Sequence, residues 1–245
     1  MDEAFYARYN ELQERHWWFQ GRKRIVLSQI RRAIQRPVGL AADFGCGTGT
    51  LLADLESFGR VVGFDTDHQA VNFCHARGHR YVQHLPEGER MPLASGSVDL
   101  LTCLDVLEHI DDDDRAISEF RRVVAPSGLA LFSVPAFPIL WGLQDEVSHH
   151  HRRYRADGLR AKLTRGGFSP IKISYFNTFL FPPIAAVRLG RRLLPSRGVQ
   201  GQDASDFDLG RQWMDRSLGR VFGSEEVLLR HCNFPFGVSL LALAN

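Results

Sequence analysis

A short apolar run that ends in a glycine-rich turn is the feature that most restricts the fold of this chain. Residues 41–44 read Ala-Ala-Asp-Phe, and glycines follow at positions 45, 47 and 49. A buried strand, a glycine turn and a helix in this order let the backbone approach a ligand closely and leave N–H groups free at the helix start. The third glycine comes two residues after the second rather than three, which departs from the dinucleotide fingerprint. The sequence therefore predicts an α/β fold with a ligand site at Gly45, Gly47 and Gly49.

An acidic residue ends the next expected strand. Residues 61–64 are Val-Val-Gly-Phe and lead to Asp65, which lies about twenty residues after the glycine turn, as in nucleotide-binding α/β folds. A carboxylate in this position can accept hydrogen bonds from both hydroxyls of a ribose. Asp65 is therefore predicted to bind the ribose of a nucleoside cofactor.

Apolar runs bounded by polar turns alternate with helical patterns along most of the chain. Between residues 115 and 124, Ile117, Phe120 and Val123 fall on one helical face. Strands that alternate with helices favour a parallel sheet with right-handed crossovers, and 245 residues with 44% hydrophobic content suit a single domain. The expected strands are 39–44, 60–64, 80–84, 98–103, 129–134, 171–176 and 236–244, with a turn at 126–128 and a further helix at 159–164.

Two segments depart from this alternation within the expected single domain of residues 1–245. Residues 1–38 predict an N-terminal helical cap, and residues 177–235 predict an insertion or lid before the last strand. Within the insertion, residues 179–194 are apolar and carry arginines. They could contact a membrane surface or a long apolar acceptor, or pack as an amphipathic helix over the sheet, and both alternatives stay open. Residues 195–210 are rich in Gly, Ser and Asp and are expected to be mobile.

The charge balance and the cysteines argue against several other classes of protein. Thirty Lys and Arg against 28 Asp and Glu give a formal charge of +2, too little to predict nucleic-acid binding by counterion release. The four cysteines lie far apart, which favours reduced thiols over a disulfide scaffold or a structural zinc site. No apolar run reaches the roughly 18 residues that cross a bilayer. We therefore expect a cytoplasmic protein, with peripheral membrane contact through residues 179–194 as the alternative; nothing in the sequence bears on its oligomeric state.

The glycine turn and three later motifs together resemble a known superfamily. Asp43, Gly45, Gly47 and Gly49 match D/E-x-G-x-G-x-G, a motif common in class I S-adenosylmethionine (SAM) dependent methyltransferases. The resemblance extends over most of residues 11–175. It implies SAM as cofactor and a Rossmann-like fold, with a mostly parallel seven-stranded sheet, helices on both faces and an antiparallel last strand. The further matching segments are 86–93, similar to the family's adenine loop, 97–100, similar to the strand that follows, and 107–110, similar to the motif after that strand.

The residues before the first strand are similar to those of ubiquinone-pathway-type small-molecule O-methyltransferases. Those enzymes carry a Trp-Trp pair and then an arginine that binds the methionine carboxylate; here Trp17 and Trp18 precede Arg22 and Arg24. The alternative is that the tryptophans anchor the core and the arginines form a solvated face. The resemblance implies these cofactor contacts: Arg24, preferred to Arg22 on its spacing to Gly45, for the carboxylate; Gly45 for the methionyl part; Asp65 for the ribose; Glu87 or its neighbours for the adenine amine; and Leu104 as pocket lining.

Two histidine-containing segments are candidates for the chemistry. Asp105, Glu108 and His109 resemble the E-x-x-E-H element that holds a divalent cation in ubiquinone-type enzymes, although Leu-Glu-His also occurs in metal-independent relatives. His150 aligns with the histidine of an H-x-R-R-Y segment found after the fifth strand in many relatives. An imidazole there can accept a proton from an acceptor hydroxyl, so His150 and His109 are the catalytic candidates. The alternative is that the side chains of the H-x-R-R-Y segment only hold their own loop in position.

The resemblance implies SAM-dependent methyl transfer to a small-molecule acceptor, with oxygen as the favoured acceptor atom and S-adenosylhomocysteine as the second product. N- or C-methylation of a sugar, polyketide or lipid intermediate is the alternative within the same fold. A non-catalytic SAM-binding module and a nicotinamide oxidoreductase are alternatives of other classes. The two histidines argue against the first of these, and the short glycine spacing argues against the second.

Overall fold

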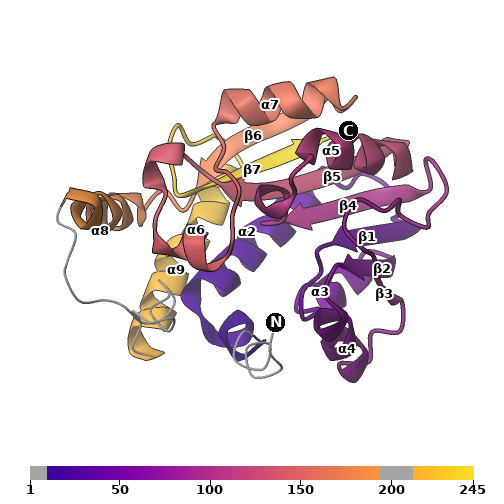
Figure 1. The fold of residues 1–245 in the computed structure, drawn as a ribbon, viewed down its shortest axis with the longest axis horizontal. Helices are drawn as coiled ribbons and strands as arrows, with labels where there is room; N and C mark the ends of the chain where they lie inside the picture. The colour runs from indigo at the N-terminus through magenta and orange to yellow at the C-terminus, as the bar shows by residue number, and fades with distance from the viewer. Residues whose placement is uncertain (1–9, 194–211) are drawn as a thin grey trace.

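The computed structural model describes residues 10–193 and 212–245, which form a seven-stranded sheet flanked by helices (Figure 1). The strand order is β3-β2-β1-β4-β5-β7-β6. The first five strands in this order are parallel, whereas β7 runs antiparallel to both β5 and β6. This topology confirms the predicted fold class. The strands are β1 (Leu40–Phe44), β2 (Arg60–Asp65), β3 (Val82–His84), β4 (Val98–Leu104), β5 (Val124–Pro135), β6 (Pro170–Phe176) and β7 (Ser239–Ala244).

Helices cover both faces of the sheet and form two apolar cores with it. On one face, Phe120 of α5 and Leu163 of α7 belong to the same buried cluster as Phe132 of β5. On the other face, α2 and α9 contribute Ile25 and Phe222 to a second cluster. The carboxyl ends of the parallel strands share one edge of the sheet, so the loops that follow these strands meet there. The helices are α2 (Trp17–Ala33), α3 (Leu52–Glu56), α4 (His68–Ala76), α5 (Asp113–Val123), α6 (Leu143–Val147), α7 (Ala156–Arg165), α8 (Phe181–Leu193) and α9 (Gln212–Leu229), with the short 3₁₀ helices η1 (Leu107–His109) and η2 (Pro138–Leu140).

Strand β5 is longer than the sequence predicts. Val98 of β4 pairs with Val124, and after a register shift Leu100 pairs with Leu129. The expected turn at 126–128 is therefore an irregularity inside β5 rather than a break before it. Proline and glycine interrupt the hydrogen bonding of a strand locally. Pairing with β4 before and after residues 126–128 nevertheless keeps this segment in the sheet.

The described parts of the insertion of residues 177–235 contain the helices α8 and α9, and no pattern in the sequence predicts α9. Helix α9 packs along α2, and a Cβ atom at Gly21 would lie 2.2 Å from Cδ1 of Phe222. The two helices thus touch closely only because α2 has no side chain at that position. The expected mobile stretch at 195–210 and the first nine residues of the predicted cap lie outside the described residues.

Helix α8 projects from the body of the molecule in Figure 1 and presents Val187 at its surface. Arg188 turns inward instead: its Nη1 donates to the carbonyl of Leu140 at 2.9 Å and lies 3.8 Å from Oδ2 of Asp145. Within the segment 179–194, Arg188 therefore does not belong to a solvent-facing or lipid-facing surface, because the buried Asp145 carboxylate attracts its guanidinium inward. The side chains of Arg191 and Arg192 lie outside the described part of the chain. Within that part, no helix combines the length and apolar character needed to cross a membrane.

The contact between α2 and α9 gives a test of the fold. Gly21→Ala is expected to lower the free energy of unfolding by about 1–3 kcal/mol, because the new methyl group overpacks against the buried Phe222 ring. Gly158→Ala in α7 is the matched control, since a Cβ there meets nothing within 4 Å. It is expected to stabilise the protein by roughly 0.4–1 kcal/mol. Urea unfolding of both variants measures the two effects, and equal stabilities would contradict the described packing of α9 on α2.

Candidate active site

The glycine turn has the left-handed backbone conformation that its three glycines predict. Gly45, Gly47 and Gly49 have φ values of 74°, 55° and 79°, a region that residues with a Cβ adopt only with strain. Space is also limited at the first of them, where a Cβ would lie 2.2 Å from Cγ2 of Val106 in the loop after β4. We call residues 45–49 the glycine loop. It places backbone that carries few side chains directly after the carboxyl end of β1.

Asp65 lies at the end of β2 and faces the glycine loop. Its Oδ2 accepts a hydrogen bond from the backbone N–H of Gly47 at 2.8 Å, and its Oδ1 accepts one from the N–H of Asp67 at 3.0 Å. Burial raises the pKa of Asp65, while these N–H groups favour the charged form and oppose that rise. The structure therefore brings together the two parts of the predicted cofactor site and fixes the carboxylate at its position.

Asp43 is buried in β1, where its side chain contacts the neighbouring strand and not the surface of the site. Its Oδ1 accepts the hydroxyl hydrogen of Thr102 on the neighbouring strand β4 at 2.6 Å. Burial raises the pKa of Asp43 to about 7, against the hydrogen bond from Thr102 and the positive charge of Arg22. Asp43 therefore links β1 to β4 behind the glycine loop.

Of the two candidate arginines, the structure places Arg22 at the site and turns Arg24 away. The Arg22 guanidinium forms an ion pair with Asp105, lies 4.7 Å from the ring centroid of Trp18, and is only 15% exposed. The Nε of Arg24 donates instead to Glu226 of α9 at 2.6 Å, and its side chain is 57% exposed. Residues two apart on a helix point about 200° apart. The spacing between Arg24 and Gly45 in the sequence does not reflect this helical phase. The structure therefore favours Arg22 over Arg24 as the candidate for the carboxylate contact.

Gln13 is a site residue that no pattern in the sequence indicates. It is buried, and its Oε1 accepts hydrogen bonds from the hydroxyls of Thr48 and Thr50. Its Nε2 would lie 3.5 Å from a Cβ at Gly47. Through Gln13, the described N-terminal segment thus contacts the glycine loop, and this contact depends on tertiary structure alone.

The remaining predicted cofactor residues surround this site at its edges. The turn that carries Glu87 starts beside Asp65, because the N–H of Leu85 donates to the Asp65 carbonyl at 2.9 Å. The Glu87 side chain is exposed there. Leu104 is the last residue of β4 and is partly buried against the core under α2. Both positions are compatible with the predicted contacts, which stay predictions.

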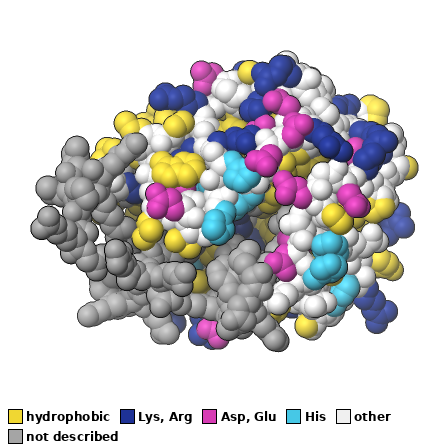
Figure 2. Space-filling model, in the orientation of Figure 1, with side chains coloured by type: hydrophobic (Ala, Val, Ile, Leu, Met, Phe, Trp, Pro, Cys, Tyr) yellow, Lys and Arg dark blue, Asp and Glu magenta, His cyan; other side chains and the backbone are white. Residues whose placement is uncertain are grey.

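Glu108, His109 and His150 form a cluster on the loops after β4 and β5. One potential ligand atom from each residue lies within 4.8 Å of those of the other two. The rings of His109 and His150 are nearly perpendicular, with centroids 4.7 Å apart. Acidic and histidine side chains gather around a hollow on the face of the molecule that Figure 2 presents. Two histidines that lie 41 positions apart in sequence are thus neighbours at the carboxyl edge of the sheet.

The electrostatics of this cluster favour uncharged groups. Glu108 is 1% exposed, and its Oε2 has no hydrogen-bond partner among the described residues. Burial and then the negative charge of Asp105 raise the pKa of Glu108 well above its usual range. Burial, and then the electrostatic effect of the neighbouring His150, lower the pKa of His109 to about 4. His109 is therefore a neutral imidazole at pH 7.

A buried aspartate that the sequence analysis did not single out fixes His150. Asp145 is fully buried; its Oδ1 lies 2.8 Å from Nδ1 of His150 and 2.7 Å from Nε of Arg153. Its Oδ2 accepts the N–H of Gly142 at 2.8 Å. Burial opposes ionisation of Asp145, but the hydrogen bonds from His150 and Arg153 outweigh it and lower its pKa to about 2. A permanent carboxylate thus orients the His150 ring and leaves Nε2 as the ring nitrogen that faces away from it.

The predicted metal ligands are only partly brought together. Asp105 is held by Arg22 in an ion pair, and His150 rather than Asp105 completes the group with Glu108 and His109. Asp105 has a φ of 56°, a strained conformation for a non-glycine residue. The resemblance to E-x-x-E-H implied the ligand set Asp105, Glu108 and His109, whereas the fold brings His150 from the next loop to Glu108 and His109.

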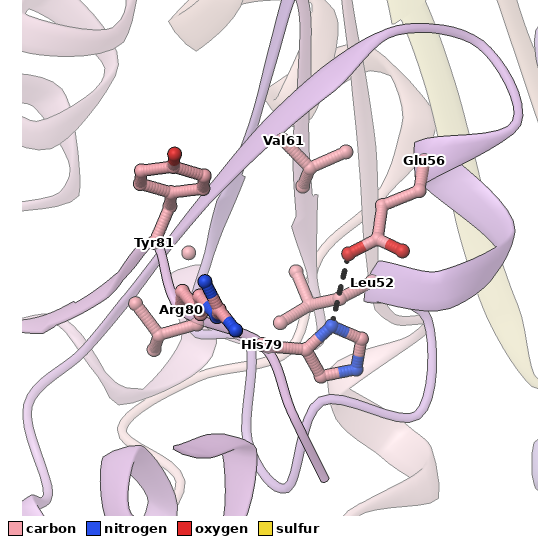
Figure 3. Close-up of a pocket in the computed structure, with 8 residues that line it drawn as sticks. Leu52, Glu56, Val61, His79, Arg80 and Tyr81 are labelled. Atoms are coloured by element: carbon pink, nitrogen blue, oxygen red, sulfur yellow. Dashed lines mark hydrogen bonds and ion pairs between the residues drawn. The ribbon is translucent and has the colours of Figure 1, made fainter.

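A small crevice lies away from this site, between α3 and the strands β2 and β3 (Figure 3). His79 and Glu56 form an ion pair beside it, with Nδ1 and Oε1 3.0 Å apart. Its volume of about 20 Å³ holds roughly one water molecule. It is too small for a cofactor or an acceptor.

Comparisons with known proteins agree with this geometry. Residues 42–132 match the family described as "Methyltransferase domain". A relative from Mycolicibacterium smegmatis, a probable SAM-dependent methyltransferase, is 34% identical over 128 residues, which cover 51% of this chain and 48% of the relative. A ubiquinone biosynthesis O-methyltransferase from Aromatoleum aromaticum is 28% identical over 146 residues, covering 54% of this chain and 62% of the relative. The chain thus spans about half the length of the curated relatives that it matches.

Solved structures share the fold over nearly the whole chain. A SAM-dependent methyltransferase from Thermotoga maritima superposes with a TM-score of 0.58 at 14% identity, covering 99% of this chain and 96% of that one. A methyltransferase from Haloferax volcanii, solved in complex with a methyltransferase activator, gives 0.60 at 16% identity with the same coverage. Residues 42–132 thus match a methyltransferase domain, and the described chain shares the fold of these solved methyltransferases.

Proposed function

We propose that the protein transfers the methyl group of SAM to a hydroxyl group of a small-molecule acceptor. The observation that carries the proposal is the pair of His150 and buried Asp145, which stands beside His109 at the carboxyl edge of the sheet. The loop that bears Glu108 and His109 also bears Val106, whose side chain borders Gly45. His150 therefore lies beside His109, whose loop also borders the glycine loop.

The residues of the site fit SAM. When bound, SAM supplies an electrophilic methyl group on a sulfonium ion. In the proposal, Asp65 accepts hydrogen bonds from the ribose hydroxyls, Arg22 pairs with the methionine carboxylate, and Gly45 leaves room for the methionyl part. Gly45 must lack a side chain because a Cβ there would collide with Val106, whereas at Gly47 a Cβ would meet nothing nearer than 3.5 Å, so the centre of the glycine loop is open, which supports this fit. Glu87 and Leu104 keep their predicted places at the adenine and at the pocket wall.

His150 is the proposed general base. As the acceptor oxygen forms its bond to the methyl carbon, the carbon–sulfur bond breaks and Nε2 of His150 takes the hydroxyl proton. Asp145 stabilises the resulting imidazolium, because its carboxylate stays ionised with a pKa of about 2. S-adenosylhomocysteine and the methyl ether leave as products. Neutral His109 lies close enough to help position the acceptor oxygen.

The choice of oxygen also rests on the relatives. Among the proteins that this chain resembles are enzymes named ubiquinone biosynthesis O-methyltransferase and malonyl-[acyl-carrier protein] O-methyltransferase. N- or C-methylation of a sugar, polyketide or lipid intermediate uses the same fold and is the alternative. Transfer of an isotope-labelled methyl group from SAM into cell extracts, followed by identification of the labelled product, decides between them.

Calorimetry with S-adenosylhomocysteine is the first test. Binding followed by label transfer to a hydroxyl supports the proposal. Binding without transfer to any extract would instead indicate a non-catalytic SAM-binding module. A thermal shift with NADH but none with SAM would indicate an oxidoreductase and overturn both.

The two arginines of α2 give a matched prediction for the cofactor site. Arg22→Gln is expected to weaken S-adenosylhomocysteine binding by roughly tenfold to a hundredfold, the value of a lost hydrogen-bonded ion pair with the carboxylate. Arg24→Gln is expected to leave the affinity unchanged, because its guanidinium pairs with Glu226 on α9. Titration calorimetry of both variants tests the assignment, and the reverse pattern would restore Arg24 as the carboxylate ligand.

A divalent cation at Glu108, His109 and His150 is a second candidate. The favouring observation is that Oε2 of Glu108 is buried without a hydrogen-bond partner, beside two imidazoles within ligand distance of each other. One carboxylate and two imidazoles suit zinc or a similar transition metal, which would polarise an acceptor oxygen. Calorimetry with Zn²⁺ on the wild type and on Glu108→Gln tests the site. Binding of one equivalent that the variant loses supports it, and equal binding by both proteins refutes it.

A further inference from the structure

A groove between α2 and α9, separate from the glycine loop and from His150, has the character of an anion site. It has a volume of about 590 Å³, within the range of roughly 300–1,000 Å³ that small-molecule sites occupy. Trp17 and Leu27 give it an apolar part. The rest is strongly basic: the cationic side chains that line it are Arg15, Lys23, Arg24, Arg31, Arg216 and Arg220.

The positive charge of this groove is only partly balanced by its own acids. Of its two acidic residues, Glu226 is already bonded by Arg24 at 2.6 Å and by Arg230 at 2.5 Å, which leaves Asp215. The whole chain carries a formal charge of only +2. The groove with its six cations and two acids therefore concentrates positive charge on one surface of a protein that is nearly neutral elsewhere, and such a surface attracts anions.

Four of the arginines have no ion-pair partner in the part of the chain that the structure describes. Within residues 10–193 and 212–245, no acidic group forms an ion pair with Arg15, Arg31, Arg216 or Arg220, and all four are exposed. Arg216 and Arg220 lie one turn apart on α9, where like charges repel and destabilise a helix. Like charges that cost stability and have no acidic partner among the described residues are explained by a ligand that supplies the counter-charge.

We propose that this groove binds an anion that carries two or more phosphoryl charges. The planar guanidinium fork matches phosphate oxygens bidentately, which a lysine ammonium does not. Four unpaired guanidiniums call for more than one negative charge, and the volume admits a ligand larger than a single phosphate ion. The Trp17 ring, which packs edge-on against Phe222 at 5.8 Å, gives the apolar part of such a ligand a fixed surface. The site is independent of the proposed methyl transfer.

The test uses the full chain and tripolyphosphate as probe. Titration calorimetry at about 0.15 M salt is expected to show binding to the wild type, with affinity at least tenfold lower in Arg216→Gln/Arg220→Gln. The matched control is Arg80→Gln/Arg160→Gln, which removes two exposed arginines outside the groove and is expected to bind as the wild type does. Unchanged S-adenosylhomocysteine binding in both double variants shows that the fold and the cofactor site are intact.

Two further arms identify the source of the phosphoryl groups. Co-sedimentation with phosphatidylglycerol vesicles but not with phosphatidylcholine vesicles, lost in the groove variant, assigns a lipid headgroup. Tripolyphosphate binding without vesicle binding assigns a soluble phosphorylated ligand. The proposal is overturned by three results: no binding of tripolyphosphate, equal binding by the groove variant, or equal affinity for the tricarboxylate tricarballylate.

Discussion

Replacing Asp65 by Ala is expected to reduce the affinity for S-adenosylhomocysteine by roughly 10²–10⁴-fold. In the proposed site the variant would lose two hydrogen bonds from ribose hydroxyls to a charged acceptor, each worth about 1.5–3 kcal/mol. It also loses the bond by which Asp65 holds the N–H of Gly47 at 2.8 Å, so the glycine loop is less well ordered for the ligand. Titration calorimetry measures the change, with melting temperature recorded to show that the protein remains folded.

A carboxylate two residues further on is the control for this experiment. Asp67 caps α4, where its Oδ1 accepts the N–H of Gln69 at 2.8 Å. Asp67→Ala is expected to cost about 0.5–2 kcal/mol of stability through the lost cap while the affinity for S-adenosylhomocysteine stays close to that of the wild type. If the two variants bound the ligand equally well, the ribose assignment of Asp65 would be wrong.

The local features of the cofactor site are readable from the sequence because short-range geometry determines them. A glycine loop at the end of a buried strand requires positive φ values, and Gly45, Gly47 and Gly49 have them. The alternation of strands and helices fixes a parallel sheet, and with it the edge at which Asp65 and the glycine loop meet. These predictions need no knowledge of which side chains touch across the fold.

Contacts between segments that are distant in the sequence cannot be predicted from such local patterns. The order of Arg22 and Arg24 along the chain does not say which one faces the sheet edge, because that depends on how α2 is rotated against α9. Asp145 is found only through its bonds to His150 and Arg153, which the loop after β5 brings together. Helix α9 can pack closely on α2 because Gly21 has no side chain, and a single glycine produces no periodic pattern in the sequence that would predict this contact.

Removal of the His150 side chain is expected to lower kcat by roughly 10²–10⁴-fold while KM for SAM changes little, because the imidazole acts on the acceptor proton and not on the cofactor. Added imidazole should restore part of the rate of His150→Ala, since a small base can occupy the vacated space. Asp145→Asn is expected to lower kcat by a smaller factor, because the ring stays in place but loses the carboxylate that stabilises its protonated form.

The adjacent histidine separates this catalytic role from a general effect of the loop. His151 is 37% exposed, and its Nδ1 pairs with Asp111 at 2.7 Å on the surface, so His151→Ala removes a similar side chain without touching Asp145. Methyl transfer to the acceptor identified by labelling is expected to proceed at nearly the wild-type rate in this variant, with no response to imidazole. A normal kcat in His150→Ala, or an equal loss in both variants, would mean that the loop only shapes the site and that the acceptor proton leaves by another route. We expect the loss of kcat in His150→Ala alone. The buried, ionised carboxylate of Asp145 is kept at a cost in stability, and its contact with Nδ1 of His150 gives that carboxylate a role in orienting the imidazole.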